Sequence, residues 1–94
     1  MSESMRNIRF VEGLNPNPKY KKETPIWFVE KYCKLAFPCP DGRSEYMWVK
    51  VGGFAKNSTY ELCGSLNNDP VYATNFQDGD EVEFNRDEII DVIE

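Results

Sequence analysis

The sequence predicts a small α+β domain: an antiparallel, strongly curved sheet of about four to five strands, one N-terminal helix, and a short C-terminal helix or strand. Three observations predict it. The 94 residues suffice for one domain with a single modest core. Apolar and polar residues alternate in several short runs, as in half-buried strands, and helical spacing occurs in only two places. Hydrophobic residues make up 40% of the chain and charged residues 29%, the composition of a folded protein.

The helix is predicted over residues 25–32. Thr24 suits an N-cap, and Pro25 suits the first helical position, where a missing N–H has no cost. Residues 1–22 have no sustained period and are predicted as an extended N-terminal arm, followed by a single α+β domain over residues 23–94. The apolar stripe of the helix consists of Ile26, Phe28, Val29 and Tyr32.

Alternating residues predict the strands. The first runs from Cys33 to Phe37 and leads into a turn at Asp41-Gly42. The stretch "EYMWVKV" at 45–51 predicts a second strand, and 60–66 a third. In the second strand, one face carries Met47, Val49 and Val51, and the other carries Tyr46, Trp48 and Lys50. Inward positions of the later strands are Tyr60, Leu62, Gly64, Leu66, Val82 and Phe84.

The segment "NNDPVYATNFQDGDEVEF" at 67–84 is predicted to be mainly scaffold. Asn68 and Asp69 can hydrogen-bond their own backbone, and Pro70 fixes the exit from the turn. "VYAT" is expected to be a short extended piece, and Gly79 supplies turn geometry. The alternative is that Asn68 and Asp69 rim a pocket beside Trp48.

The C-terminal stretch "NRDEIIDVIE" is predicted as a short helix. Asn85 is a possible N-cap, and Glu88 lies three residues later, as in a capping box. The β-branched residues of this stretch also suit a closing strand, so that alternative stays open.

Charge is unevenly distributed. The formal net charge is −5. Residues 69–94 hold one arginine against nine acids, a net charge of −8. This field repels nucleic-acid phosphates and attracts basic protein surfaces, so it disfavours direct nucleic-acid binding. The alternative is that the acids only keep a small domain soluble. The predicted acidic surface for a partner consists of Asp78, Asp80, Glu81, Glu83, Asp87, Glu88 and Asp91.

No side chains for catalysis or for a cofactor stand out. The chain contains no histidine, so it lacks the usual proton shuttle and the commonest metal ligand. Cys33, Cys39 and Cys63 have none of the zinc-site spacings and are predicted to be free thiols in a reducing compartment. No serine lies in a Gly-x-Ser-x-Gly elbow, and no apolar run is long enough for a membrane span. A cytoplasmic protein without enzymatic activity, metal or cofactor is therefore predicted.

Aromatic and amide side chains are better candidates for a functional site than catalytic or metal-binding groups. Tyr46 and Trp48 would form a flat platform beside Lys50, and Arg43 could meet an anionic group. Asn68 and Asp69 complete the predicted binding set. The alternative is that Trp48 is buried beneath the predicted helix.

Three motifs in order over residues 33–92 carry a family resemblance. They are "FPCPDGRSEYMWVKV" at 37–51, "GSLNNDPVY" at 64–72 and "DGDEVEFNRDEIIDV" at 78–92. Together they resemble the YegJ-like family of bacterial domains of unknown function. The family's usual closing aromatic is replaced by Val92. The resemblance implies a compact α+β domain and no reaction.

The function predicted from these features is a non-catalytic binding module. It would act as an inhibitor or immunity-type protein on a basic protein partner, an idea that also draws on relatives found near toxins and immunity proteins. One alternative is a protein that binds or sequesters a small planar, nucleotide-like ligand. A further alternative is an acidic mimic of nucleic acid, which requires the carboxylates from Asp78 to Glu94 to share one face.

Overall fold

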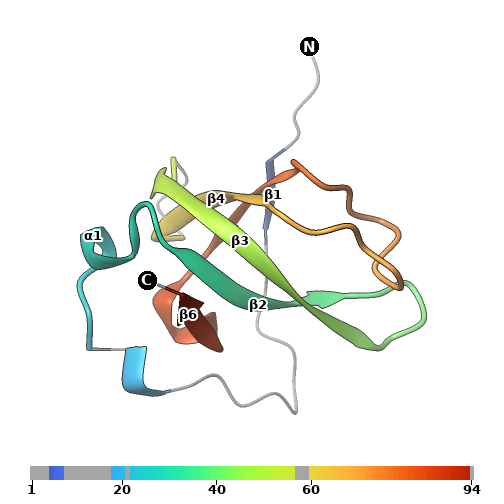
Figure 1. Ribbon diagram of the computed structural model, residues 1–94, viewed down its shortest axis with the longest axis horizontal. Helices are drawn as coiled ribbons and strands as arrows, with labels where there is room; N and C mark the ends of the chain where they lie inside the picture. The colour runs from blue at the N-terminus through green and yellow to red at the C-terminus, as the bar shows by residue number, and fades with distance from the viewer. Residues whose placement is uncertain (1–4, 8–17, 21, 57–59, 94) are drawn as a thin grey trace.

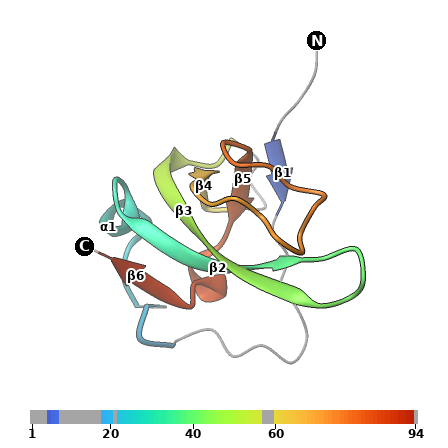
Figure 2. The same cartoon turned by 45° about the vertical axis from the view of Figure 1, so that its right-hand side comes forward.

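Six strands form one sheet that curls around the core (Figure 1). The computed structural model describes residues 5–7, 18–20, 22–56 and 60–93. The order across the sheet is β1-β5-β4-β3-β2-β6. Strands β2 to β6 pair antiparallel, and β1 lies parallel to β5 (Figure 2), so the predicted α+β class with an antiparallel sheet is confirmed. The strands are β1 (Met5–Asn7), β2 (Tyr32–Pro38), β3 (Ser44–Phe54), β4 (Leu62–Leu66), β5 (Glu81–Phe84) and β6 (Asp91–Ile93).

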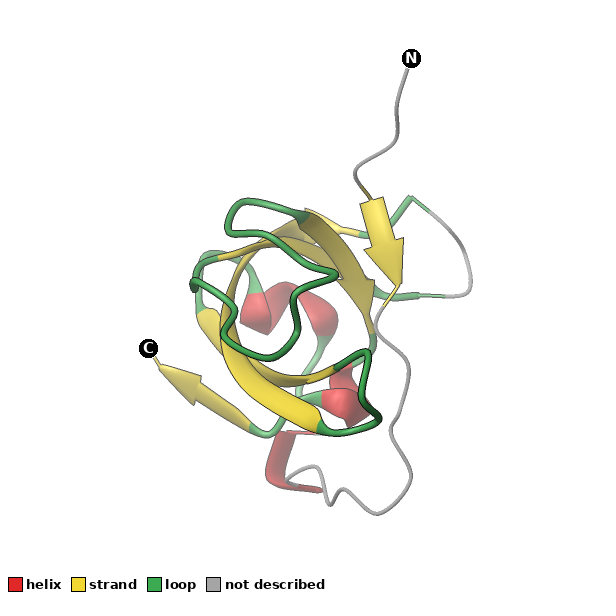
Figure 3. Cartoon of the chain, turned by 90° about the vertical axis from the view of Figure 1, so that its right-hand side faces the viewer, coloured by secondary structure: helices red, strands yellow, loops and turns green. Residues whose placement is uncertain are grey.

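The concave side of the sheet holds the core, as the view along the curl shows (Figure 3). Strand β3 is the longest and pairs with both β2 and β4. A register shift between Val51 and Gly53 marks a bulge, and bulges bend and twist a strand. The inward faces predicted by alternation are confirmed, since their side chains are buried: Met47, Val49, Val51, Tyr60, Leu62, Leu66, Val82 and Phe84.

The segment between β4 and β5 crosses one end of the curled sheet (Figure 3). It inserts two buried side chains, Ala73 and Phe76, and the Phe76 ring meets Phe37 of β2 edge to face, with centroids 4.9 Å apart. The predicted extended piece "VYAT" is wrong, because bends and turns occupy these positions. The scaffold role predicted for the segment agrees with this packing.

The predicted helix over 25–32 is too long. Helix α1 spans only Pro25–Phe28 and buries Phe28 in the core. Glu30 then adopts a left-handed backbone conformation, with φ of 74°, and its N–H donates to the carbonyl oxygen of Val51. Tyr32 already belongs to β2. Sheet pairing therefore overrides a local apolar pattern that suits a helix equally well.

Most of the predicted arm 1–22 lies outside the described residues. Within it, Met5–Asn7 forms β1 and Pro18–Tyr20 a 3-10 helix, η1. Tyr20 is buried against Trp27 and Phe28, and its hydroxyl donates to the Asp91 carboxylate at 3.3 Å. This end of the arm is therefore part of the core.

The C-terminal stretch contains a 3-10 helix and a strand in place of the predicted short helix. η2 spans Arg86–Glu88, and β6 pairs with β2, so the closing strand is the correct alternative. The predicted capping box is confirmed, since the Glu88 carboxylate accepts the Asn85 N–H at 2.8 Å. One turn satisfies this box, and the β-branched residues that follow complete the edge of the sheet.

Arg86 joins three segments that are distant in sequence. Its guanidinium donates two hydrogen bonds to the Glu61 carboxylate, at 3.0 and 2.9 Å, and a third to the carbonyl oxygen of Glu23 at 2.6 Å. A bidentate pair fixes orientation as well as distance. The start of β4, the entry to α1 and η2 are thereby held together. Among the described residues, no helix has the length and apolar character needed to cross a membrane.

Candidate binding face

The convex side of β2 and β3 carries alternating aromatic and cationic side chains. The register places Tyr32 opposite Lys50 and Lys34 opposite Trp48. The Lys50 ammonium lies 5.4 Å from the centre of the Tyr32 ring, and the Lys34 ammonium 5.1 Å from that of Trp48. Both distances are within the range of cation–π attraction. We call this set, together with Tyr46, the aromatic face; its residues are Tyr32, Lys34, Tyr46, Trp48 and Lys50.

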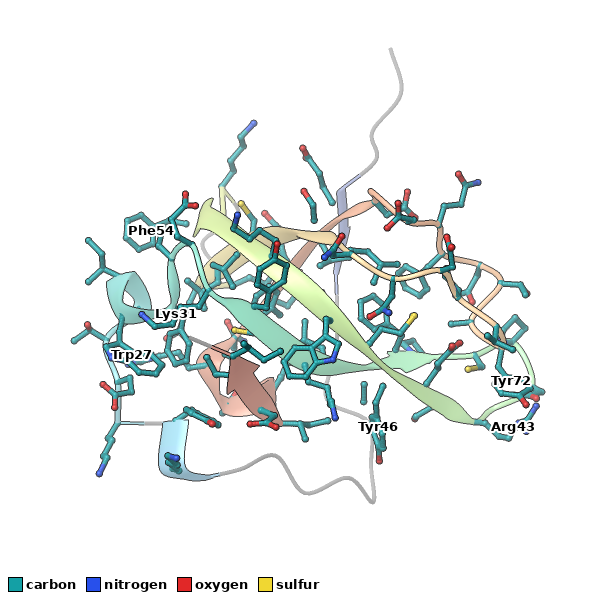
Figure 4. The ribbon with its side chains drawn as sticks, viewed as in Figure 1. Trp27, Lys31, Arg43, Tyr46, Phe54 and Tyr72 are labelled. Carbon is teal, nitrogen blue, oxygen red and sulfur yellow. The ribbon has the colours of Figure 1, made fainter. Side chains whose placement is uncertain are left out.

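The aromatic face is accessible. Tyr46 is 53% exposed, and Figure 4 shows its side chain pointing away from the ribbon. Trp48 is half-buried and is not a member of the core cluster, so the alternative that buries it beneath α1 is wrong. Lys50 also pairs with Glu30 at 3.6 Å, but both side chains are well exposed, and such a pair contributes little to stability.

The sequence identified three residues of this face and missed two. Alternation along "EYMWVKV" was enough to place Tyr46, Trp48 and Lys50 on one face of the strand. The apolar stripe places Tyr32 in the predicted helix, and nothing in the sequence singles out Lys34. Their proximity to Lys50 and Trp48 depends on the β2–β3 register, which the hairpin connection sets.

Arg43 lies apart from the aromatic face, at the end of the β2–β3 hairpin (Figure 4). Its Nε donates to the Asp41 carboxylate at 2.7 Å, and its guanidinium carbon is 4.4 Å from the centre of the Tyr72 ring. The prediction that grouped Arg43 with Lys50 is therefore wrong: the hairpin carries Arg43 to the other end of β3 from Lys50.

Asn68 bonds to the backbone of β3 at Trp48, within the aromatic face. Its side-chain oxygen accepts the backbone N–H of Trp48, and the N–H of Asn67 donates to the Trp48 carbonyl oxygen at 2.9 Å. The β3–β4 pairing thus continues past Leu66, and Asp69 follows it as an exposed residue. The pocket rim predicted for Asn68 and Asp69 stays a prediction. A small depression with a volume of about 220 Å³ lies between Gly52, Lys56, Cys63, Gly64, Ser65 and Glu81.

Glu45 holds the backbone of the loop at residues 71–73. Its carboxylate accepts the backbone N–H groups of three consecutive residues: Val71 at 3.0 Å, and Tyr72 and Ala73 at 2.8 Å each. These backbone donors, led by Ala73 and Val71, favour the charged form and hold the pKa of the Glu45 carboxyl below its usual range. The sequence offered Glu45 only as a motif residue, since its partners lie more than twenty positions away.

The lowered pKa of Glu45 predicts acid sensitivity. A carboxyl whose pKa is lower in the folded state stabilises the fold above its ordinary pKa of about 4.3, and this stabilisation is lost as the pH falls through the folded-state value. We expect Glu45→Gln to lower the melting temperature at pH 7 and to flatten its decline between pH 5 and pH 3. Parallel acid-side curves for the two proteins would contradict this role.

Two members of the predicted acidic surface are not on the surface. Glu83 is 3% exposed and accepts the Lys56 N–H at 3.2 Å, and Glu88 is 9% exposed within its capping box. The prediction is wrong for both, because the fold buries these carboxylates and each accepts a backbone N–H. Asp80 accepts the Gln77 N–H in a turn. The exposed members are Asp78, Glu81, Asp87 and Asp91.

The three cysteines are free thiols. Burial raises the pKa of Cys33 to about 12, with Lys31 acting weakly against it. Burial also raises the pKa of Cys39, as do Asp41 and Glu45. The pKa of Cys63 is raised by burial and by Glu81 and Glu83. Thiolates are thus disfavoured at all three positions. In the part of the chain that the structure describes, no group of three or more acidic or cysteine side chains is arranged for a metal ion.

Residues 26–93 match the family DUF2314, described as an uncharacterized protein conserved in bacteria. The chain belongs to the DUF2314 family. No curated protein and no solved structure matches it. The DUF2314 match begins within α1 and ends with β6. It includes the whole aromatic face, Glu45 and the loop that Glu45 holds, whereas β1 and η1 precede it.

Proposed function

We propose that the protein is a non-catalytic binding module that recognises a basic protein partner through the aromatic face. The observation that carries the proposal is the exposure of Tyr46 beside the half-buried Trp48, on the side of β3 opposite the core. Tyrosine and tryptophan provide most of the energy in many protein interfaces, because large rings lose little conformational entropy on contact. An open sheet surface suits a macromolecule better than a small molecule, which binds in a concave site.

The charge of the chain supports a basic partner. The net charge is −5, and Glu30 and Asp91 lie at the sides of the aromatic face: Glu30 pairs with Lys50, and Asp91 stands opposite Lys34 in the register of β6 and β2. The cations of the face are thus accompanied by carboxylates. Charges at an interface rim mainly guide approach and select partners. An inhibitor or immunity role in the bacterial cytoplasm, and membership of the YegJ-like group, belong to the same proposal.

Capture of a partner from extract of the native host tests this function. The immobilised full chain is compared with Tyr46→Ala and with Phe54→Ala, which removes an aromatic ring of matched exposure, 56% against 53%. We expect Tyr46→Ala to weaken capture of the same partner about tenfold or more and Phe54→Ala to leave it unchanged. Raised salt should weaken capture, because it screens charge.

Two results would contradict parts of the proposal. Equal capture by Tyr46→Ala and the unaltered chain would exclude the aromatic face as the contact surface. Equal capture at low and high salt would remove the argument for a basic partner. The melting temperature of each variant is measured in parallel to confirm that it folds.

A small planar anion is a second candidate ligand for the same face. The two cation–π pairs favour it, since Tyr32 and Trp48 offer rings while Lys50 and Lys34 offer ammonium groups. Adenosine monophosphate that binds there should quench the fluorescence of the chain, and Trp48→Phe should abolish the response although Trp27 remains. Unchanged fluorescence would contradict this candidate.

The described carboxylates do not favour an acidic mimic of nucleic acid. Its requirement was a continuous face of carboxylates from Asp78 to Glu94. The burial of Glu83 and Glu88 interrupts that face.

A further inference from the structure

A short loop projects beside the β2–β3 hairpin, at the end of the molecule opposite α1 (Figures 1 and 4). We call residues 69–73 the projecting loop. Val71 is 66% exposed and Tyr72 is 54% exposed. These two adjacent side chains face solvent and contribute nothing to the core.

The backbone of the projecting loop is held from two sides. The Glu45 carboxylate accepts the N–H groups of Val71, Tyr72 and Ala73. The Ala73 side chain is completely buried, which anchors the end of the loop in the core. Pro70 fixes one backbone angle at its start. A loop held in this way keeps its exposed side chains in place.

The Tyr72 ring also has a cation beside it. The Arg43 guanidinium lies 4.4 Å from its centre. The Asp41 carboxylate accepts the backbone N–H of Arg43 at 3.0 Å and its Nε–H at 2.7 Å. Asp41 also offsets the charge of Arg43. The ring is therefore presented with a cation beside it but with little net charge.

We infer that the projecting loop is a preformed contact element that inserts Val71 and Tyr72 into an apolar cleft of a protein partner. Preorganisation raises affinity because a loop that is already ordered in the free protein loses little conformational entropy on binding. A tyrosine stacked on arginine is the kind of anchor that dominates interfaces. An apolar cleft matches two exposed apolar side chains whose neighbouring charges compensate one another. The inference rests on the proposed binding function and adds a second contact surface to it.

Site-specific photo-cross-linking tests the inference. Benzoylphenylalanine is placed at position 71 of the full chain and, as a matched control, at position 26 in α1, because Ile26 is 67% exposed and Val71 is 66% exposed. Both proteins are irradiated in extract of the native host. We expect an adduct of one discrete mass from position 71 and none of that mass from position 26.

Competition shows whether Tyr72 is part of the contact. An excess of the unaltered chain should abolish the adduct, whereas the same excess of Tyr72→Ala should leave most of it. The inference is overturned if position 71 gives no adduct, if position 26 gives the same adduct, or if Tyr72→Ala competes fully.

The result is separable from that of the proposed function. Loss of capture by Tyr46→Ala without an adduct from position 71 would leave the aromatic face as the contact and remove the projecting loop. An adduct from position 71 with undiminished capture by Tyr46→Ala would support the projecting loop and exclude the aromatic face as the contact.

Discussion

Replacing Phe37 with alanine should lower the free energy of unfolding by about 3 to 5 kcal/mol. Phe37 is fully buried, and its ring meets Phe76 edge to face, so alanine loses both the transfer energy and the aromatic contact. A domain of this size is stable by on the order of 5 to 14 kcal/mol. The substitution therefore removes a large part of the total stability.

Urea unfolding followed by circular dichroism measures this loss, and Phe54→Ala is the matched control. Phe54 is 56% exposed, so removing the same ring there should change stability by less than about 0.5 kcal/mol. If Phe37→Ala does not fold, Phe37→Leu should still give a measurable loss. Equal effects at positions 37 and 54 would show that the Phe37 ring does not hold the end of the sheet.

The loss at position 37 should also affect the candidate sites. Phe76 belongs to the segment that carries Ala73 and the projecting loop, and Phe37 is its aromatic neighbour on β2. Weaker packing there should speed hydrogen exchange at Val71 and Tyr72 more than within β3. The packing of Phe37 in the core therefore also determines how firmly the projecting loop is held.

Strands β2 to β5 could be predicted from local pattern because one face of each is buried. In β3, alternation of apolar and polar residues follows directly from a core on one side, so the faces of Met47 and Trp48 were assigned correctly. The helix was not, because an apolar stripe at Ile26 and Val29 fits a helix until the long-range bond from Glu30 to Val51 decides the local backbone. Local pattern does not contain that bond.

The candidate sites depended on contacts between distant positions. Lys34 and Trp48 meet only through the β2–β3 register, and Glu45 reaches residues 71–73 only after the segment has crossed the end of the sheet. The acidic C-terminal third shows that sequence composition can also place a residue on the surface wrongly. Composition counts Glu83 as surface charge, whereas its neighbours in the fold bury it.

Gly64→Ala should lower the free energy of unfolding by about 1 to 3 kcal/mol. Gly64 stands opposite Val51, next to the bulge in β3. A Cβ at this position would overlap the carbonyl oxygen of Lys50 and lie 2.7 Å from Cγ1 of Val49. The carbonyl cannot move away without disturbing the β3–β4 pairing, because it is part of the backbone of β3.

Gly52→Ala is the matched control for this prediction. A Cβ at Gly52 would meet no atom within 4 Å, so the same chemical change should alter stability by less than about 0.5 kcal/mol. Urea midpoints of the two variants measure the difference.

Position 64 also matters for binding, because it lies against β3, which carries the aromatic face on the other side of the same sheet. If Gly64→Ala displaces β3 at Lys50, the distance between Lys50 and Tyr32 should change, and capture should weaken even where the variant folds. A variant at position 64 with the stability of Gly52→Ala would contradict the close approach of β3 and β4.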